Sequence, residues 1–329
     1  MTKRRLLLAL GVAISVALAA YAISTLEWPI FWQTLRSVQW PWLVAAVLAT
    51  VISVAGRAFR WHFIGAVFGG GYVAFWRATT IGYLGNFVLP MRAGELIRVW
   101  ALSRLSSLSL SATATSSVLD RLSDVATLCV VFGVVLLVHG TSAVGVGAIG
   151  GLVAVLSAAL ILIATLIFWR GRVERAVSRF GKGRWQHGAT LVRGWLDDTL
   201  AVLRDSISLR RGGVILAMSL AIFATDFFVM WLVMAAFGWS LPFFAAVTFG
   251  TFLAISSSLP AAPGYIGVYQ VAAIFALDIY GIEATEAVAF AVVLQLLTFS
   301  LFVALGNWSI MQSTLPIKEL LRAAIPKTK

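Results

Sequence analysis

The sequence predicts an all-α polytopic membrane protein with about six full spans and two re-entrant broken-helix units. Of its 329 residues, 60% are apolar and only 12% are charged, and the mean hydropathy is +0.95. An ordinary soluble domain carries about 25% charged residues. Apolar runs near the bilayer-crossing length of about 20 residues recur along the chain. In a membrane protein, a net charge of +12 indicates basic loops on the cytoplasmic side, where they face an anionic membrane surface. We therefore expect no nucleic-acid partner.

The first apolar run, 6–23, follows the basic residues Lys3, Arg4 and Arg5. Positive charge before an apolar run predicts a cytoplasmic N-terminus. The run is long enough to cross the bilayer. Although 17–19 resembles a signal-peptide cleavage site, we favour an uncleaved first span.

A second span is expected at 40–56, after an outside loop containing Glu27. Arg57 and Arg60 follow this run and are interpreted as marking its cytoplasmic end.

The next apolar piece, 75–88, is too short to cross a bilayer comfortably, and Leu89 and Pro90 end it. A second half-helix is expected from Gly94 towards Arg104. Irregular backbone at membrane depth is tolerated only where it is buried in protein or lines a wet cavity. This segment is therefore predicted to be a re-entrant unit with a break near the midplane.

Charged residues surround this break, where Asn86, Arg92, Glu95 and Arg98 are predicted to bind substrate. Charge inside a membrane is costly, so these side chains should face protein, water or a polar ligand. Guanidinium groups suit phosphate, with Glu95 orienting them or exchanging a proton. The alternative is a structural ion pair of Glu95 with one of the arginines.

A third span is expected at 125–138, with Asp120, Arg121 and Asp124 at its entry. The two aspartates are four residues apart and share one helix face. They form either a solvated helix start, favoured by the helix dipole, or one wall of a substrate cavity closing against Arg92 or Arg98.

A fourth span is expected at 143–169 and a fifth at 214–237. Between them, 170–211 is basic and has apolar residues at helical spacing, which predicts an amphipathic helix on the cytoplasmic leaflet. Asp226 lies near the centre of the fifth span. Its carboxylate is protonated, hydrogen-bonded to another helix, or a proton-coupling group.

A second broken unit is expected where 243–258 and 271–277 flank a Pro- and Gly-rich break, and a final span at 287–311 follows. Tyr265, Tyr269 and Gln270 supply neutral hydrogen-bonding groups for the substrate. Five residues in the two breaks are predicted hinges: Pro90, Gly94, Pro260, Pro263 and Gly264.

The two breaks match without gaps, because Leu89, Pro90 and Gly94 have the spacing of Leu259, Pro260 and Gly264. Three expected spans separate the units, and an odd number of crossings makes the units an inverted repeat. The chain is thus predicted to be a single membrane domain, 1–329. Its expected parts are a first repeat region at 40–169, the basic segment at 170–211 and a second repeat region at 212–311.

Inverted repeats of broken helices are typical of alternating-access transporters. The half-helix N-termini after Gly94 and Gly264 would direct positive dipole ends at an anion. The sequence therefore predicts a flippase or transporter of an anionic or phosphate-bearing lipid, rather than an enzyme. The sequence contains no nucleotide-binding motif, and no cofactor is expected. Because Cys129 is the one cysteine and the three histidines are far apart in the sequence, we expect no metal site.

Asn86, Leu89, Pro90, Arg92, Gly94, Glu95 and Arg98 form a motif followed by Asp120, Arg121 and Asp124 and later by Leu259, Pro260, Pro263, Gly264 and Gly267. In this combination the chain resembles the flippase-like transmembrane region of the lysylphosphatidylglycerol synthase family. The resemblance implies a stand-alone member, without the aminoacyltransferase domain, that handles phospholipids, hopanoid-type lipids or polyprenyl-linked lipids. Asp120 and Gln270 stand where the family often has glutamate.

Two rival interpretations remain open. One is an integral-membrane transferase acting on a polyprenyl phosphate, with Asp120 and Asp124 holding Mg²⁺. The other is a non-transporting partner of a lipid-modifying enzyme or glycosyltransferase, recruited through 170–211. The expected location is the bacterial cytoplasmic (inner) membrane, with both termini cytoplasmic.

Overall fold

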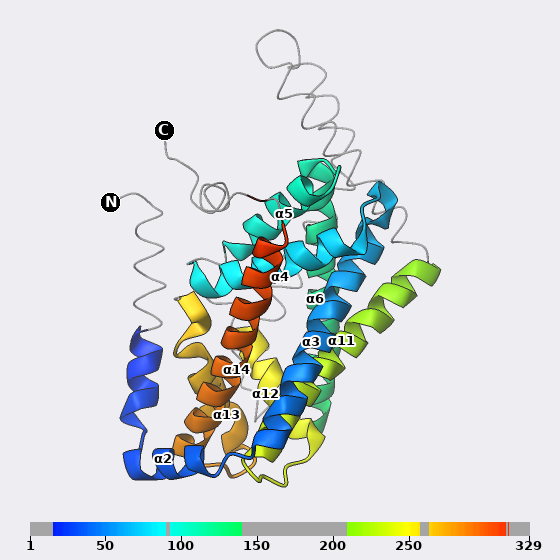
Figure 1. Ribbon diagram of the computed structural model, residues 1–329. Coiled ribbons are helices and arrows are strands. Elements are labelled where there is room, and N and C mark those ends of the chain that lie inside the picture. Colours follow the sequence, from blue (N-terminus) through cyan, green and yellow to red (C-terminus); the bar gives the residue numbers. More distant parts are fainter. Residues whose placement is uncertain (1–15, 90–92, 140–208, 257–262, 314, 316–329) are drawn as a thin grey trace, which may run out of the picture.

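The computed structural model describes residues 16–89, 93–139, 209–256, 263–313 and 315 (Figure 1). Within these ranges every regular element is helical: α2 (Trp28–Arg36), α3 (Trp40–Gly65), η1 (Ala66–Phe68), α4 (Tyr72–Val88), α5 (Gly94–Leu105), α6 (Leu110–His139), α11 (Leu209–Ala236), α12 (Phe243–Ser256), η4 (Pro263–Tyr265), α13 (Val268–Asp278) and α14 (Ala284–Met311). The predicted all-α class is confirmed.

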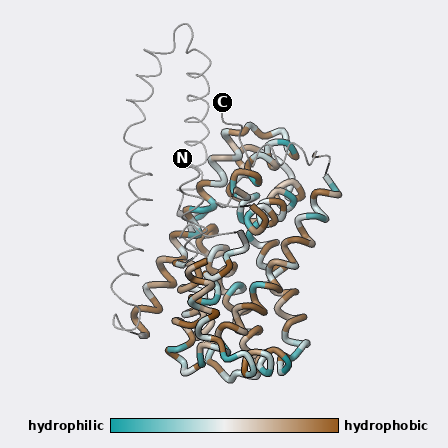
Figure 2. Tube along the Cα trace, turned by 90° about the vertical axis from the view of Figure 1, so that its left-hand side faces the viewer, coloured by the Kyte–Doolittle hydropathy of each residue, from teal (hydrophilic) through white to brown (hydrophobic). Residues whose placement is uncertain are grey.

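Four described helices are long and apolar enough to cross a membrane, namely α3, α6, α11 and α14. Figure 2 shows hydrophobic residues along most of the length of the helices. The predicted span at 143–169 lies outside the described residues, as do most of the predicted span at 6–23 and the basic segment at 170–211 apart from 209–211, which begin α11.

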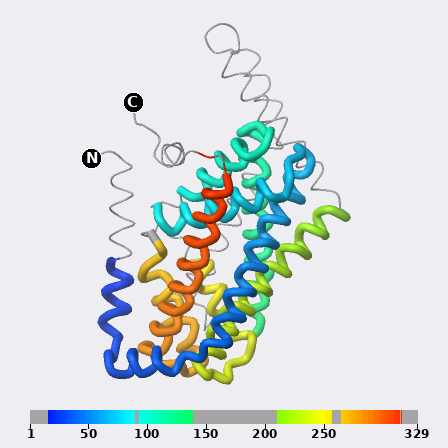
Figure 3. The backbone as a smooth tube through the Cα atoms, viewed as in Figure 1, coloured from blue at the N-terminus to red at the C-terminus, as the bar shows by residue number. Residues whose placement is uncertain are grey.

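The helices form two sets with the same order: a long helix, two short helices separated by a break, and a second long helix. The first set is α3 to α6 and the second is α11 to α14. The first helices of the sets run side by side in opposite directions (Figure 3). The Gln39 N–H donates to the Ala236 carbonyl at 2.8 Å, and Arg211 donates to the Phe63 carbonyl at 3.1 Å. The start of each helix therefore lies beside the end of the other.

The short helices lie at opposite ends of the bundle, with α4 and α5 in the upper part of Figure 1 and α12 and α13 in the lower part. The two breaks nevertheless come together. Phe87, near the end of α4, packs its ring edge to face on Tyr265, with centroids 5.8 Å apart. Two interrupted pairs thus meet inside one bundle.

The predicted short helices are confirmed, because α4 and α12 end at the breaks and α5 and α13 follow them. Leu89 is extended, as expected for a residue before proline. Helix α4 can lie close to α5 because Gly82 faces Gly94. A Cβ built on Gly94 would lie 2.0 Å from the Gly82 carbonyl oxygen.

Residues 28–36, next to the predicted outside loop, form the short helix α2, and the side of the membrane on which it lies stays a prediction. Two predicted boundaries were wrong. Helix α3 continues to Gly65, so Arg57 and Arg60 lie within a long apolar helix instead of marking its end. Helix α6 begins at Leu110, so Asp120 and Asp124 are interior residues of that helix rather than its entry. In α3 and α6 the apolar pattern alone underestimated the length of the helix, because charged residues that pair between the two helices lie within it.

The apolar core lies mainly between α11, α12, α13 and α14, where Phe249 and Phe290 pack with ring centroids 5.1 Å apart. A smaller core, formed mainly by α3, α4 and α5, contains Trp61 and Phe75. Buried charges lie beside this smaller core.

Candidate functional site

A cavity of about 390 Å³ lies within the bundle and is lined by residues of both helix sets. Its polar lining consists of Thr50, Ser53, Arg57, Tyr83, Asn86, Glu95, Arg121, Asp124, Asp226, Tyr265, Tyr269 and Thr298. Polar and charged groups at this depth of an apolar bundle are typical of a substrate or ion pathway.

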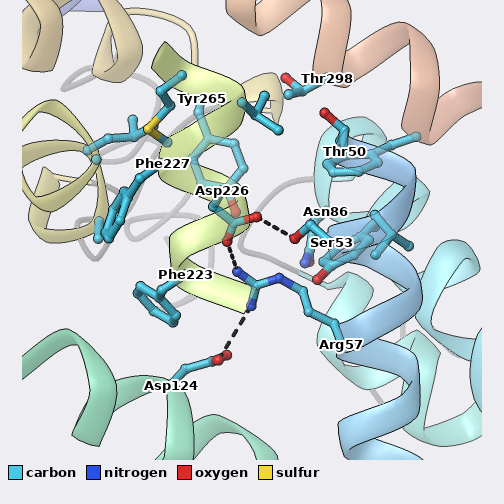
Figure 4. A pocket seen from close by; sticks show the side chains of 18 of the residues that line it. Thr50, Ser53, Arg57, Asn86, Asp124, Phe223, Asp226, Phe227, Tyr265 and Thr298 are labelled. Carbon is cyan, nitrogen blue, oxygen red and sulfur yellow. Dashed lines mark hydrogen bonds and ion pairs between the residues drawn. The ribbon is translucent and has the colours of Figure 1, made fainter. Parts of the chain in front are cut away.

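Arg57 lies at the centre of the charged side of the cavity. Its guanidinium donates to Asp226 on α11 and, at 3.4 Å, to Asp124 on α6 (Figure 4). Ser53, one turn earlier on α3, also donates to Asp226. The ring of Phe223 lies 5.7 Å from the Arg57 guanidinium carbon. Arg57 thus joins three helices where they face the cavity.

Arg121 on α6 forms the second charged wall. Its guanidinium lies 2.9 Å from Asp124 and 3.2 Å from Glu95 on α5. Asn86 on α4 donates to the same Glu95 carboxylate at 3.4 Å. The Arg121 side chain is 36% exposed, more than that of any other arginine in these ion pairs. A ligand in the cavity could therefore reach it with little rearrangement.

A second layer of charge lies behind this wall. Arg60 pairs with Asp120 and Asp124 at 2.8 Å each and donates to Ser219 at 2.9 Å. Arg98 pairs with Asp120 at 2.8 Å.

This inner layer is closed to the cavity, since Arg60 is 0% exposed, Asp120 1% and Arg98 3%. The Arg98 guanidinium also stacks over the Trp61 ring, 4.1 Å from its centroid. Arg98 and Asp120 were predicted to bind substrate, but the structure places them away from the cavity lining, where they hold α3, α5 and α6 together. Asp120 is not a solvated helix start.

The described ion pairs are balanced in charge, with four arginines and four carboxylates: Arg57, Arg60, Arg98, Arg121, Glu95, Asp120, Asp124 and Asp226. Of these, two arginines and three carboxylates line the cavity. The wall can therefore accept hydrogen bonds from a ligand as well as donate them.

Part of the cavity lining is neutral and includes Tyr265, Tyr269 and Thr298. Substrate binding by the two tyrosines stays a prediction. Gln270 does not line the cavity. Its side chain accepts from the Gly267 N–H at 2.8 Å and donates to Gln295 at 2.7 Å, and Gln295 donates to the Gly264 carbonyl. Gln270 holds the second break in shape.

Three of the five predicted hinge residues, Gly94, Pro263 and Gly264, lie within the described part of the chain. Gly264 has φ +75° in the left-handed region, which favours glycine, and Gly94 permits the close contact of α4 with α5. Pro263 begins η4. Pro90, Arg92 and Pro260 lie outside the described residues. Phosphate binding by Arg92 therefore stays a prediction.

Sequence reasoning missed Arg57, Arg60 and Ser53 as members of the site. Arginines three residues apart on α3 complement aspartates four residues apart on α6, since each pair occupies one helix face. The sequence carries only a weak signal for them: apolar residues continue beyond Arg57 and Arg60 as far as Phe68, although His62 interrupts them.

The fold and the site together define a polytopic membrane protein with a charged cavity between two interrupted helix pairs. The chain matches the model of the lysylphosphatidylglycerol synthase TM region over residues 8–306, and it belongs to this family. No curated protein and no solved structure matches it.

Proposed function

We propose that this protein moves a phosphate-bearing polar lipid from one leaflet to the other. The observation that carries the proposal is the charged cavity between span-length helices and the two interrupted pairs, in a chain of a lipid-related membrane family. A lipid head group needs polar contacts while it crosses the apolar interior, and this cavity offers them where the helices exclude bulk lipid.

Arg57 and Arg121 are the arginines placed to bind the phosphate. Each is already paired with carboxylates, so a phosphate joins or displaces these partners rather than meeting a free charge. The carboxylates of Glu95, Asp124 and Asp226 can then accept hydrogen bonds from hydroxyl or ammonium groups of the same head group. Tyr265 and Tyr269 supply neutral contacts elsewhere in the cavity.

The arrangement of the helix sets supports alternating access. The long helices α3 and α11 run in opposite directions, and the two breaks meet at Phe87 and Tyr265. These features agree with an inverted repeat whose interrupted helices move against each other. Exchange of carboxylate partners at Arg57 would accompany that movement, with Asp226 or Glu95 as the proton-coupling group if transport is proton-linked.

The proposed orientation places both termini and 170–211 on the cytoplasmic side of a bacterial inner membrane, because basic residues favour that side. A role for 170–211 in recruiting a lipid-modifying enzyme is compatible with transport. It concerns residues that, apart from 209–211, lie outside the described part of the chain.

The transferase alternative is disfavoured by the ion pairs. Asp120 and Asp124 were its Mg²⁺ ligands, but Asp120 is buried against Arg60 and Arg98, and Asp124 contacts Arg57, Arg60 and Arg121. Guanidiniums at both carboxylates repel a divalent cation.

The test is head-group translocation in proteoliposomes that contain fluorescent phosphatidylglycerol, measured by the fraction of fluorophore accessible to dithionite. Wild-type protein should move the lipid faster than protein-free vesicles, and Arg121→Gln should slow it. Arg36→Gln, on the exposed end of α2, is the matched control and should leave the rate unchanged. Equal rates with and without the wild-type protein would refute the proposal for this lipid.

A further inference from the structure

An apolar groove of about 430 Å³ lies between α3 and α14, outside the cavity. Its lining is apolar apart from Ser300: Trp40, Leu43, Val44, Val47, Leu48, Val293, Leu296 and Leu297. Leu48 and Leu296 are 61% and 58% exposed. Since both helices are span-length and apolar, this groove faces the hydrocarbon of the bilayer.

The groove leads towards the cavity along one face of α3. Leu43, Val47, Thr50, Val54 and Arg57 follow one another at spacings of four and three residues, so they form a single stripe. The first two of these residues line the groove and the last three line the cavity. The stripe thus changes from hydrocarbon at Leu43 to charge at Arg57 over about 21 Å, at 1.5 Å per residue.

Helix α14 lies between the two spaces and presents a different face to each. Leu294, Thr298 and Phe302 line the cavity, whereas Val293 and Leu297, on the neighbouring stripe, line the groove. A molecule that occupied both spaces would therefore pass between α3 and α14. It would need an apolar end in the groove and a polar end in the cavity.

We propose that the seam between α3 and α14 is the lateral port of the lipid pathway, and that a hydrocarbon tail of the lipid lies in the groove while its head group occupies the cavity. This inference rests on the proposed function. The occupant is a lipid tail because the groove is apolar, opens on the bilayer and continues into a head-group-sized polar space along one helix face.

Photolabelling tests the occupant directly. The protein is reconstituted in vesicles of phosphatidylglycerol carrying a diazirine near the end of one acyl chain, and labelled peptides are identified by mass spectrometry. We expect labelling of 40–48 and 293–300 to exceed that of 214–220 by about tenfold. This ratio corresponds to a preference of the acyl chain for the groove of ~1.4 kcal/mol. Val214, Leu216 and Leu220 are exposed apolar residues of α11 and report ordinary lipid contact. Equal labelling of the two faces would overturn the port.

Filling the groove tests its role in transport. Leu297→Trp should slow translocation by about tenfold, equivalent to ~1.4 kcal/mol, relative to Leu216→Trp on α11. Titration with glycerol phosphate should show unchanged binding, because the cavity lining is intact. Leu297→Phe, a smaller addition, serves if the tryptophan variant fails to elute as a single species in detergent. Translocation at the Leu216→Trp rate would contradict the port.

The two proposals fail differently. If the wild-type protein moves no lipid, the transport function is refuted, while photolabelling still decides whether a tail occupies the groove. If transport occurs and Leu297→Trp leaves it unchanged, the function stands and the lipid enters elsewhere.

Discussion

The Arg57 guanidinium donates to the Asp226 carboxylate, joining α3 to α11 at the wall of the cavity. Both side chains are partly accessible, at 18% and 27%. Because Arg57 also contacts Asp124, a ligand or a proton that changes one of these contacts also changes the packing of three helices. The pair thus links occupation of the site to its conformation.

We expect Arg57→Ala to lower translocation by about tenfold or more, since losing ~1.4 kcal/mol of charge-assisted contact with the head group has that effect. The measurement is dithionite accessibility in proteoliposomes, with Arg36→Gln as the control. If the double variant Arg57→Asp, Asp226→Arg restored translocation, the ion pair itself, and not the position of the arginine, would be what transport requires. No restoration is expected, because the exchange places a carboxylate on α3 beside Asp124, which then faces a like charge instead of the Arg57 guanidinium.

Arg60 and Asp120 should matter for stability rather than for binding. Removing one partner of a buried ion pair costs about 3–5 kcal/mol, so Asp120→Asn should lower the thermal unfolding temperature in detergent markedly. Arg121→Gln removes a more exposed partner and should destabilise the protein less than Asp120→Asn. If the two variants destabilise equally, or if Arg121→Gln leaves transport intact, the division into a structural layer and a binding layer is wrong.

Gly94→Ala should disrupt the first broken unit. The added Cβ would lie 2.0 Å from the Gly82 carbonyl oxygen, a clash that α4 and α5 can relieve only by separating. We expect loss of the monodisperse protein in detergent. Gly133→Ala is the matched control, since a Cβ on Gly133 meets nothing within 4 Å, and it should stabilise α6 by up to about 1 kcal/mol. Normal yield and stability of Gly94→Ala would contradict the packing described.

Gln270→Leu tests whether Gln270 acts on the second break or on the substrate. The change removes two hydrogen bonds, the one that the Gln270 side chain accepts from the Gly267 N–H and the one that it donates to Gln295. Each buried group left unsatisfied costs about 1–3 kcal/mol, so stability should fall. Glycerol phosphate should bind the folded fraction as it binds wild type. Weaker binding with unchanged stability would indicate that Gln270 contacts the substrate directly.

Much of the architecture could be predicted because its signals are local. The short apolar runs before Leu89 and Leu259, and the glycines after them, predicted α4, α5, α12 and α13. The length of a span and the break at a proline depend on neighbouring residues alone. The extension of α3 through Arg57 and the early start of α6 could not be predicted this way, because distant partners neutralise their charges.

The sequence by itself determined the membrane class, the two interruptions and the presence of guanidinium and carboxylate groups at membrane depth. Hydropathy, proline and glycine act over a few residues, so a linear reading suffices for them. Only the tertiary structure decided that Arg57 faces the cavity with Asp226 while Arg98 is buried against Asp120. That choice depends on which helix faces meet, because an ion pair between residues far apart in the chain forms only where packing brings them within hydrogen-bonding distance.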